Sequence, residues 1–240
     1  MISCINLLGG NNMNQTQDFT KGVIWKQLLF FFFPILIGSF FQQLYNTVDT
    51  IIVGQTVGTS ALAAVGSTGN LTNLIINFYV GLSTGASVVI AQYYGAQNNK
   101  KIHQAVHTSY SLAIVSGILM MLFGLFFSYQ CLDAIGTPHD ILNDATLYMQ
   151  LYFLCMIPGA IYNIGAGILR AVGDSKRPLY YLIVCSIVNV VFDFIFVVIF
   201  HQGIAGAAIA TVIAQSVCAI LVTIQLMRTN EVYKLTLSKM

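Results

Sequence analysis

The sequence predicts an all-α integral membrane protein, a bundle of six transmembrane helices. Charged residues make up 8% of the 240 residues, whereas an ordinary soluble domain has roughly 25%. Apolar residues make up 57%, and the mean hydropathy is +0.78. A water-soluble core of this size has no room for so much apolar surface, so most of the chain is expected to face lipid. The net charge of +2 gives no support for nucleic-acid binding.

Six apolar windows are long enough for spanning helices, which need about 20 residues each. The predicted helices cover about residues 27–52, 61–93, 104–129, 145–169, 178–200 and 204–227. Barrel strands are not favoured, because their sequences alternate with period two over about 10 residues. Gly81 and Gly85 in the long second window suggest a bend or a continuation beyond the membrane surface.

The helices would form one lobe over residues 27–228, flanked by two polar segments. Residues 1–26 are predicted to be a polar N-terminal segment, in which 1–12 are consistent with a mis-assigned start. Residues 229–240 are expected to be a tail or the beginning of a linker.

The basic residues fall in four places: before the first span, between spans two and three, between spans four and five, and after the sixth. They are Lys21, Lys26, Lys100, Lys101, Arg170, Lys176, Arg177, Arg228, Lys234 and Lys239. With six spans, these places share one side of the membrane, and Lys- and Arg-rich loops mark the cytoplasmic side. We therefore expect a multi-pass protein of the cell (plasma) membrane with both termini in the cytoplasm.

Two carboxylates, Asp49 and Asp193, lie inside predicted spans. An ionisable side chain there is costly and is by default a candidate functional site. The alternative is a side chain that reaches headgroup water, and Asp49, near a helix end, is more open to it than Asp193. Helix rise places both in the outer half of the membrane, with Thr211 at similar depth and Asn189 one turn from Asp193. Such a cluster suits a proton or a hard cation such as Na⁺.

The first predicted helix becomes polar late in its course. It carries Gln42, Gln43, Tyr45, Asn46 and Thr47 ahead of Asp49. Lipid does not tolerate such a surface, so this face is expected to line a cavity or to pack on other helices. Pro34 removes a backbone hydrogen bond and predicts a bend, either static or moving.

Gly81-Leu-Ser-Thr-Gly85 matches the expression for a nucleophile elbow, but it lies in an apolar helix rather than a strand-to-helix turn. Close helix packing by small residues is favoured instead. The same interpretation applies to Gly165, Gly167, Gly203 and Gly206.

Other reactive residue types give no recognisable centre. His103 and His107 lie one turn apart, but the sequence offers no further metal ligand beside them. The cysteines are Cys4, Cys131, Cys155, Cys185 and Cys218, and they form no C-x-x-C pair. The chain has no nucleotide-binding loop and no nucleophile–base arrangement within its spans. We therefore expect no enzyme activity, no cofactor and no resident metal.

Several longer motifs occur in order along the predicted helices. They are Pro34, Gln42-Gln-Leu-Tyr-Asn-Thr-Val-Asp49 with Val53-Gly54, Ala61-Leu-Ala-Ala64, Gly81-Leu-Ser-Thr-Gly-Ala-Ser87, Ala91-Gln-Tyr-Tyr-Gly95, Arg170-Ala-Val-Gly-Asp174 with Lys176-Arg-Pro178, Asn189-Val-Val-Phe-Asp193, and Gly203-Ile-Ala-Gly-Ala-Ala-Ile-Ala-Thr211. Together they resemble the amino-terminal half of multidrug and toxic compound extrusion (MATE) transporters, over nearly everything after Lys21.

The resemblance implies a fold of two six-helix lobes, related by a pseudo-two-fold axis along the membrane normal. It implies efflux of cationic or amphipathic compounds by antiport against H⁺ or Na⁺. It further implies an ion-coupling cluster at Asp49, Asn189, Asp193 and Thr211, with Tyr45 nearby and Pro34 as a bending proline. Since the chain stops at Met240, where a second lobe would follow, the expected partner is that lobe, as a separate chain or a second copy of this one.

Three alternatives remain at this point. A lipid-linked oligosaccharide flippase of the same superfamily would be expected to line its cavity with basic residues, and the spans contain none. A membrane enzyme would need a reactive constellation that the spans do not offer. A non-transporting fragment or subunit would differ from a transporter lobe in failing to bind a cationic dye.

Overall fold

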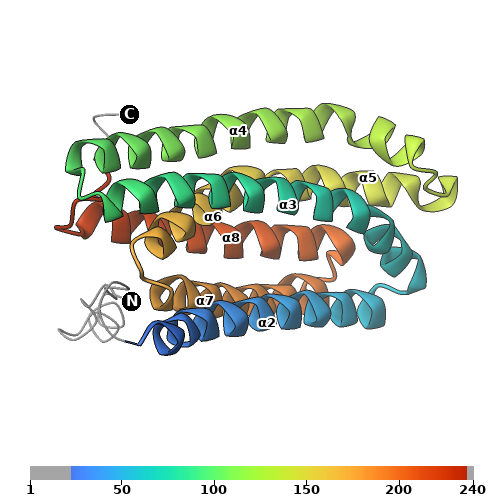
Figure 1. Ribbon diagram of the computed structural model, residues 1–240. Helices are drawn as coiled ribbons and strands as arrows, with labels where there is room; N and C mark the ends of the chain where they lie inside the picture. Colours follow the sequence, from blue (N-terminus) through green and yellow to red (C-terminus); the bar gives the residue numbers. More distant parts are fainter. Residues whose placement is uncertain (1–22, 237–240) are drawn as a thin grey trace.

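The computed structural model describes residues 23–236, except for the side chains of residues 24, 59 and 60. Its helices are α2 (Ile24–Thr56), α3 (Thr59–Gly95), α4 (Asn99–Ala134), α5 (His139–Phe153), α6 (Met156–Ala171), α7 (Lys176–Asp193) and α8 (Gly203–Arg228), with a π-helix, η1 (Phe194–Ile199), between α7 and α8. They run side by side along one axis (Figure 1), and the described residues form no strand. The all-α bundle is confirmed.

Five helices are long and apolar enough to cross a membrane, and α5 and α6 make a sixth span if that bent pair counts as one. The two helices meet at 47°. The predicted fourth span is thus two helices rather than one. Pro158 in the first turn of α6 explains the break, because proline has no N–H to continue the hydrogen bonding of α5 and its ring clashes with the preceding turn.

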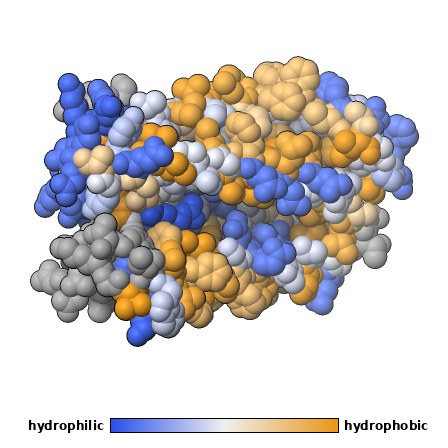
Figure 2. Space-filling model, viewed as in Figure 1, coloured by the Kyte–Doolittle hydropathy of each residue, from blue (hydrophilic) through white to orange (hydrophobic). Residues whose placement is uncertain are grey.

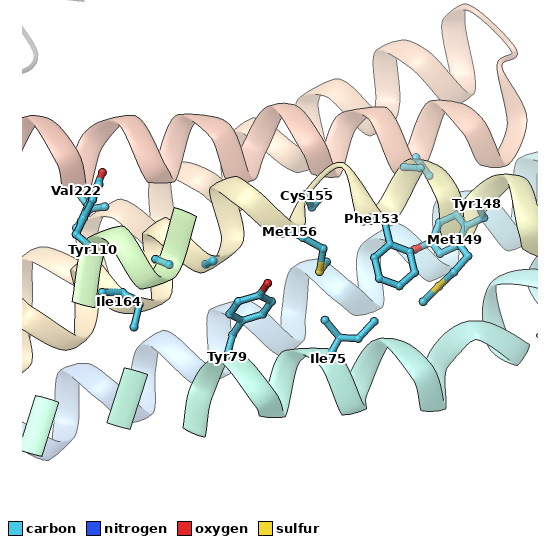
Figure 3. Packing of buried hydrophobic residues seen from close by; sticks show 14 of the residues in the cluster. Ile75, Tyr79, Tyr110, Tyr148, Met149, Phe153, Cys155, Met156, Ile164 and Val222 are labelled. Carbon is cyan, nitrogen blue, oxygen red and sulfur yellow. The ribbon is translucent and has the colours of Figure 1, made fainter. Parts of the chain in front are cut away.

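The packed body of the lobe consists of α3, α4, α5, α6 and α8, with α6 against α3, α4 and α8. Figure 3 shows how their buried side chains meet: Ile75 and Tyr79 from α3 lie near Met149 and Phe153 from α5 and Met156 from α6. Helix α2 lies outside this body and packs chiefly on α7, which in turn packs on α8. Because most of its large apolar side chains are exposed, α2 is suited to face lipid.

Several helices approach closely at glycines. A Cβ on Gly117 of α4 would lie 2.9 Å from the Cα of Ile157 in α6, and one on Gly165 would lie 2.7 Å from Val222 of α8. A Cβ on Gly167 would run into Ser83, so the packing prediction holds for Gly165 and Gly167. It also holds for one further glycine, Gly206, whose added Cβ would lie 3.0 Å from the Cβ of Phe196.

The packing prediction is wrong for Gly81 and Gly85. An added Cβ at either position would meet no described atom of another helix within 4 Å. These glycines therefore leave open space on the surface of α3 rather than admitting a neighbouring helix. Gly203 has a different role, since its φ of +58° lies in the left-handed region and begins α8.

The basic connections lie at one end of the bundle. Helix α2 begins and α8 ends there, beside the α3–α4 and α6–α7 connections (Figure 1). Hydrophilic residues gather at the two ends of the face in Figure 2, with hydrophobic ones over much of the middle. Lys21 and Lys239 lie outside the described residues.

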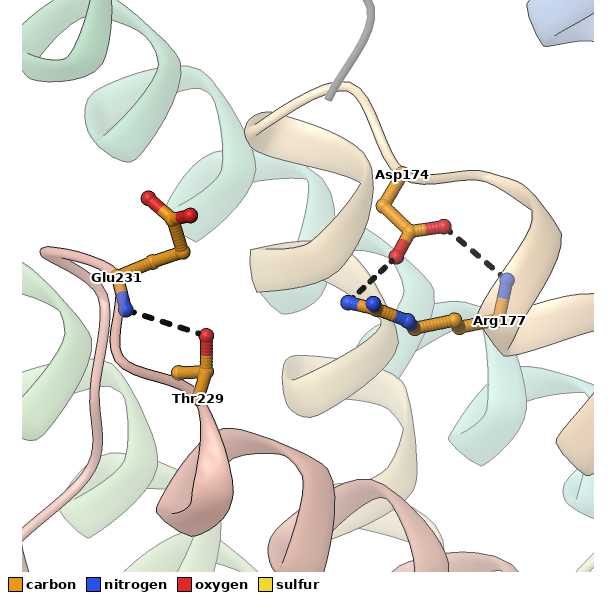
Figure 4. Close-up of polar contacts among 4 residues, drawn as sticks. All are labelled: Asp174, Arg177, Thr229 and Glu231. Atoms are coloured by element: carbon orange, nitrogen blue, oxygen red, sulfur yellow. Dashed lines mark hydrogen bonds and ion pairs between the residues drawn. The ribbon is translucent and has the colours of Figure 1, made fainter. Parts of the chain in front are cut away.

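Polar contacts order this basic end. In the α6–α7 connection, Arg177 Nη1 lies 3.2 Å from Asp174 Oδ2, and the Arg177 backbone N–H donates to Asp174 Oδ1 at 3.1 Å (Figure 4). After α8, the backbone N–H of Glu231 donates to Thr229 Oγ1 at 3.3 Å. Tyr233 and Leu235 are buried, so the segment that follows α8 packs against the lobe.

Candidate functional site

Asp193 is the last residue of α7 and is completely buried. Neither oxygen of its carboxylate has a hydrogen-bond partner within residues 23–236. A buried carboxylate without donors is costly, because desolvation is not offset by any bond to the charged form. Such oxygens fit a bound proton or cation, which would supply the missing contact.

Asn189 and Thr211 connect α7 to α8 one turn before Asp193. Asn189 is 1% exposed, and its Nδ2 donates to Thr211 Oγ1 at 3.4 Å. The Thr211 hydroxyl in turn donates to the carbonyl of Ala207 at 3.1 Å. Asn189 Oδ1 has no partner among the described residues, so it remains available as a further oxygen donor.

Asp49 approaches this group from α2. It is half-buried, and its carboxylate lies close enough to Asp193 for the two charges to interact. Its Oδ1 is buried and unpartnered within the described part of the chain. The structure therefore brings Asp49 near Asp193, and Asn189 onto Thr211, across three helices.

The backbone changes type directly after Asp193. The π-helix η1 begins at the next residue, and the Phe200 N–H donates to the Ile195 carbonyl at 2.9 Å, five residues back. Such segments are frequent at functional sites. Gly206 lets the start of α8 lie against η1, since its added Cβ would come within 3.1 Å of the Phe196 backbone. Nothing in the apolar sequence from Phe194 to Ile199 distinguishes a π-helix from an α-helix, so the sequence did not predict it.

Helix α5 adds two tyrosines that the sequence analysis missed. Tyr148 is within electrostatic range of Asp49, Tyr45 and Asp193. It stacks on Tyr152, one turn later, with ring centroids 6.1 Å apart. Their spacing of four residues places both on one helix face, and this was the signal that could have identified them.

The remaining predicted residues all lie on α2. Tyr45 is half-buried beside Gln42, and Pro34 lies inside the helix. Asn46 is exposed, as are Gln43 and Thr47. The polar face of α2 is thus only partly covered by the described chain. This fits a wall of a cavity, whose other wall these residues do not provide.

His103 and His107 stack on each other, and His107 also contacts the segment after α8. The two rings stack with centroids 4.0 Å apart, and His107 Nδ1 lies 2.7 Å from the His103 carbonyl oxygen. The Thr236 backbone N–H donates to His107 Nε2 at 3.0 Å. His107 therefore joins α4 to the segment after α8. Among residues 23–236, no group of three or more His, Cys, Asp or Glu side chains is placed to hold a metal.

Two of the buried cysteines, Cys185 and Cys218, make reciprocal contacts between α7 and α8. Cys185 Sγ of α7 donates to the Ala214 carbonyl at 3.2 Å, and Cys218 Sγ of α8 donates to the Tyr181 carbonyl at 3.3 Å. Each thiol thus contacts the other helix one turn before the partner cysteine. These contacts are consistent with packing of α7 on α8. Cys4 lies outside the described residues.

Ionisable side chains buried among membrane-spanning helices without a partner are typical of transporters. The particular family follows from sequence comparison. The MatE family model matches residues 34–195, and the chain therefore belongs to the MATE family.

Individual relatives agree with this assignment. The chain is 31% identical over 203 residues to the probable multidrug resistance protein YoeA of Bacillus subtilis (strain 168), with 83% of this chain and 44% of YoeA covered. Its fold matches a crystal structure of MATE in the bent conformation with a TM-score of 0.83 and 27% identity, covering 90% of this chain and 48% of that one. It matches an outward-facing multidrug resistance MATE transporter equally, with a TM-score of 0.83 and 28% identity over 89% of this chain and 48% of that one. The chain spans about half the length of the proteins it matches.

Proposed function

We propose that this chain is the amino-terminal lobe of a secondary active efflux transporter that exports cationic or amphipathic compounds in exchange for H⁺ or Na⁺. Membership of the MATE family and the multidrug resistance relatives support the substrate class. The single observation that carries the coupling role is the fully buried Asp193, whose two oxygens lack partners in the described chain. A transporter needs such a site, which binds an ion in one state and releases it in another.

The arrangement of helices gives the coupling ion a mechanical effect. A cation or proton held at the site offsets the repulsion between Asp49 on α2 and Asp193 on α7. Its release leaves two like charges within interaction range in a low dielectric, which favours separation of the helices. Helix α2 packs chiefly on α7 and has few contacts with the rest of the lobe, so we propose that it is the element that moves. Pro34 weakens α2 about ten residues ahead of Gln42 and Tyr45, and it is the point where a bend would change the cavity wall.

The test replaces each carboxylate by the amide of the same shape. In a transporter assembled with its second lobe, Asp193→Asn and Asp49→Asn are expected to abolish coupled export of a fluorescent cationic dye and to leave membrane insertion intact. Asp133→Asn is the matched control, because Asp133 is exposed at the end of α4. If cells that express either single variant, at the same level as the parent, keep normal drug resistance, the coupling role is contradicted.

The orientation proposed here places the basic end of the bundle in the cytoplasm of a cell membrane. Single cysteines at Asp140 and Gln202, at the opposite end, are then expected to react with an impermeant thiol reagent in intact cells. Cysteines at Lys100 and Lys176 are expected to stay unlabelled until the membrane is opened. All four side chains are exposed, so access to the reagent depends on the side of the membrane. Labelling at Lys100→Cys in intact cells reverses the orientation.

A further inference from the structure

A groove lies between α3 and α4 at the basic end of the bundle, away from the acidic cluster. Its volume is about 540 Å³, within the range of about 300–1,000 Å³ that is usual for small-molecule sites. On α3 it is lined at one-turn intervals by Gly81, Gly85, Val89 and Tyr93, and on α4 by residues from Lys101 to Leu112.

Missing side chains create the groove. Gly81 and Gly85 have open space where a Cβ would be, so no described neighbour uses the gap that they leave. Ala86 of α3 and Ala105 of α4 continue the small-residue lining. Elsewhere in the lobe, glycines such as Gly117 admit another helix, but here the space remains open.

The end of the groove carries a fixed positive charge. Lys101 Nζ lies 5.3 Å from the centroid of the Tyr93 ring, a cation–π contact that holds the ammonium over the groove. Lys100, its neighbour in the sequence, does not line the groove. Both lysines are exposed.

Polar groups continue from Lys101 toward the middle of α4. Gln104 and Thr108 line the groove and are exposed, followed by Leu112 roughly 16 Å along the helix from Lys101. Farther along α4, Val115 and Leu119 are exposed at 53% and 63%, as on a helix that faces hydrocarbon. Amide and hydroxyl groups on such a face are costly unless they have a partner.

We propose that this groove binds one anionic phospholipid of the adjacent leaflet. Its phosphate lies at Lys101, because an ammonium at the membrane surface attracts an anionic headgroup. Its glycerol esters accept hydrogen bonds from Gln104 and Thr108, and one acyl chain lies over Gly85 and Gly81. Along the groove, the positive charge is followed by hydrogen-bond donors and then by an apolar channel. A phospholipid has its phosphate, esters and acyl chains in the same order.

Native mass spectrometry of the purified chain in a non-ionic detergent tests the charge, with dioleoyl phosphatidylglycerol and dioleoyl phosphatidylcholine as probes. Phosphatidylglycerol is expected to be retained in preference to phosphatidylcholine. Lys101→Gln is expected to lower its retention about fivefold, as for the loss of one basic residue near an anionic lipid. Lys100→Gln is the matched control and is expected to bind as the parent does. Equal retention in the two lysine variants, or no preference between the lipids, overturns the proposal.

A second pair of variants tests the channel. Gly85→Leu fills the groove and is expected to displace phosphatidylglycerol. Gly69→Leu adds the same side chain to α3 at another open position outside the groove and is expected to leave binding unchanged. Circular dichroism checks that both variants are helical. If Gly85→Leu retains the lipid, or if it instead lowers association with a second lobe, the groove is not a phospholipid site.

Discussion

Asp193 owes its properties to its position at the end of α7, where α7, η1 and α8 meet. It is buried without a described partner, whereas Asp174 near the other end of the same helix is paired with Arg177 at 3.2 Å. Asp174, just before α7, and Asp193, at the end of α7, thus have completely different environments. The paired one orders a turn, and the unpaired one leaves two buried oxygens without a described donor.

A substitution at Thr211 tests the cluster while leaving both carboxylates in place. Thr211→Val removes the oxygen that accepts from Asn189 Nδ2 and leaves a buried amide unpaired, at about 1–3 kcal/mol. We expect it to weaken the apparent affinity for the coupling ion about tenfold. Thr211→Ser keeps the oxygen and is expected to behave like the parent. The measurement is dye efflux against ion concentration in the assembled transporter, and identical curves for Val and Ser show that this hydroxyl has no such role.

The individual helices show how far the sequence could predict this structure. The apolar windows and the positions of Asp49, Asn189, Asp193 and Thr211 follow from composition and helical periodicity. Within the fourth window, Pro158 was the available sign of the α5–α6 break. The π-helix could not be predicted, because it depends on how η1 packs against α8 at Gly206. Gly81 and Gly85 could not be told from packing glycines, since the sequence does not reveal which face of α3 they occupy.

The contact between α4 and α6 at Gly117 makes a prediction about stability. Gly117→Ala places a methyl group 2.9 Å from the Cα of Ile157, a backbone atom that cannot move aside without shifting α6. We expect a loss of about 1–3 kcal/mol in unfolding free energy. Gly66→Ala in α3 meets no described atom of another helix within 4 Å and is expected to be neutral or stabilising, because alanine favours helix. Thermal unfolding in detergent compares the two, and equal stability of both variants contradicts the close approach.

The molecule as a whole has two kinds of surface. The outer side of α2 is apolar, with Phe30 and Phe40 exposed at 66% and 60%, and suits lipid. The amide side chains of Gln43 and Asn46 on the same helix are also exposed, although hydrocarbon is unfavourable for them. Figure 2 shows hydrophilic residues in the middle of the face, between the α2 side and the α3 side of the bundle. A second wall over this polar face would complete a cavity at the acidic cluster.

We therefore predict that the chain transports only together with a second six-helix lobe. Unpaired polar groups exposed to hydrocarbon cost several kcal/mol each, which favours association of the polar face. If the two lobes are related by an axis along the membrane normal, as the family resemblance implies, a second copy of this chain has a compatible orientation, and so does a separately encoded lobe. Expressed alone, the chain is expected to give a dimer by cross-linking and mass photometry in detergent, or else an unstable product. Gln43→Leu with Asn46→Leu should favour the monomer, because it removes exposed amide groups from that face, whereas Asp133→Leu at the end of α4 should not. A stable monomer that exports dye from proteoliposomes would show that one lobe is sufficient.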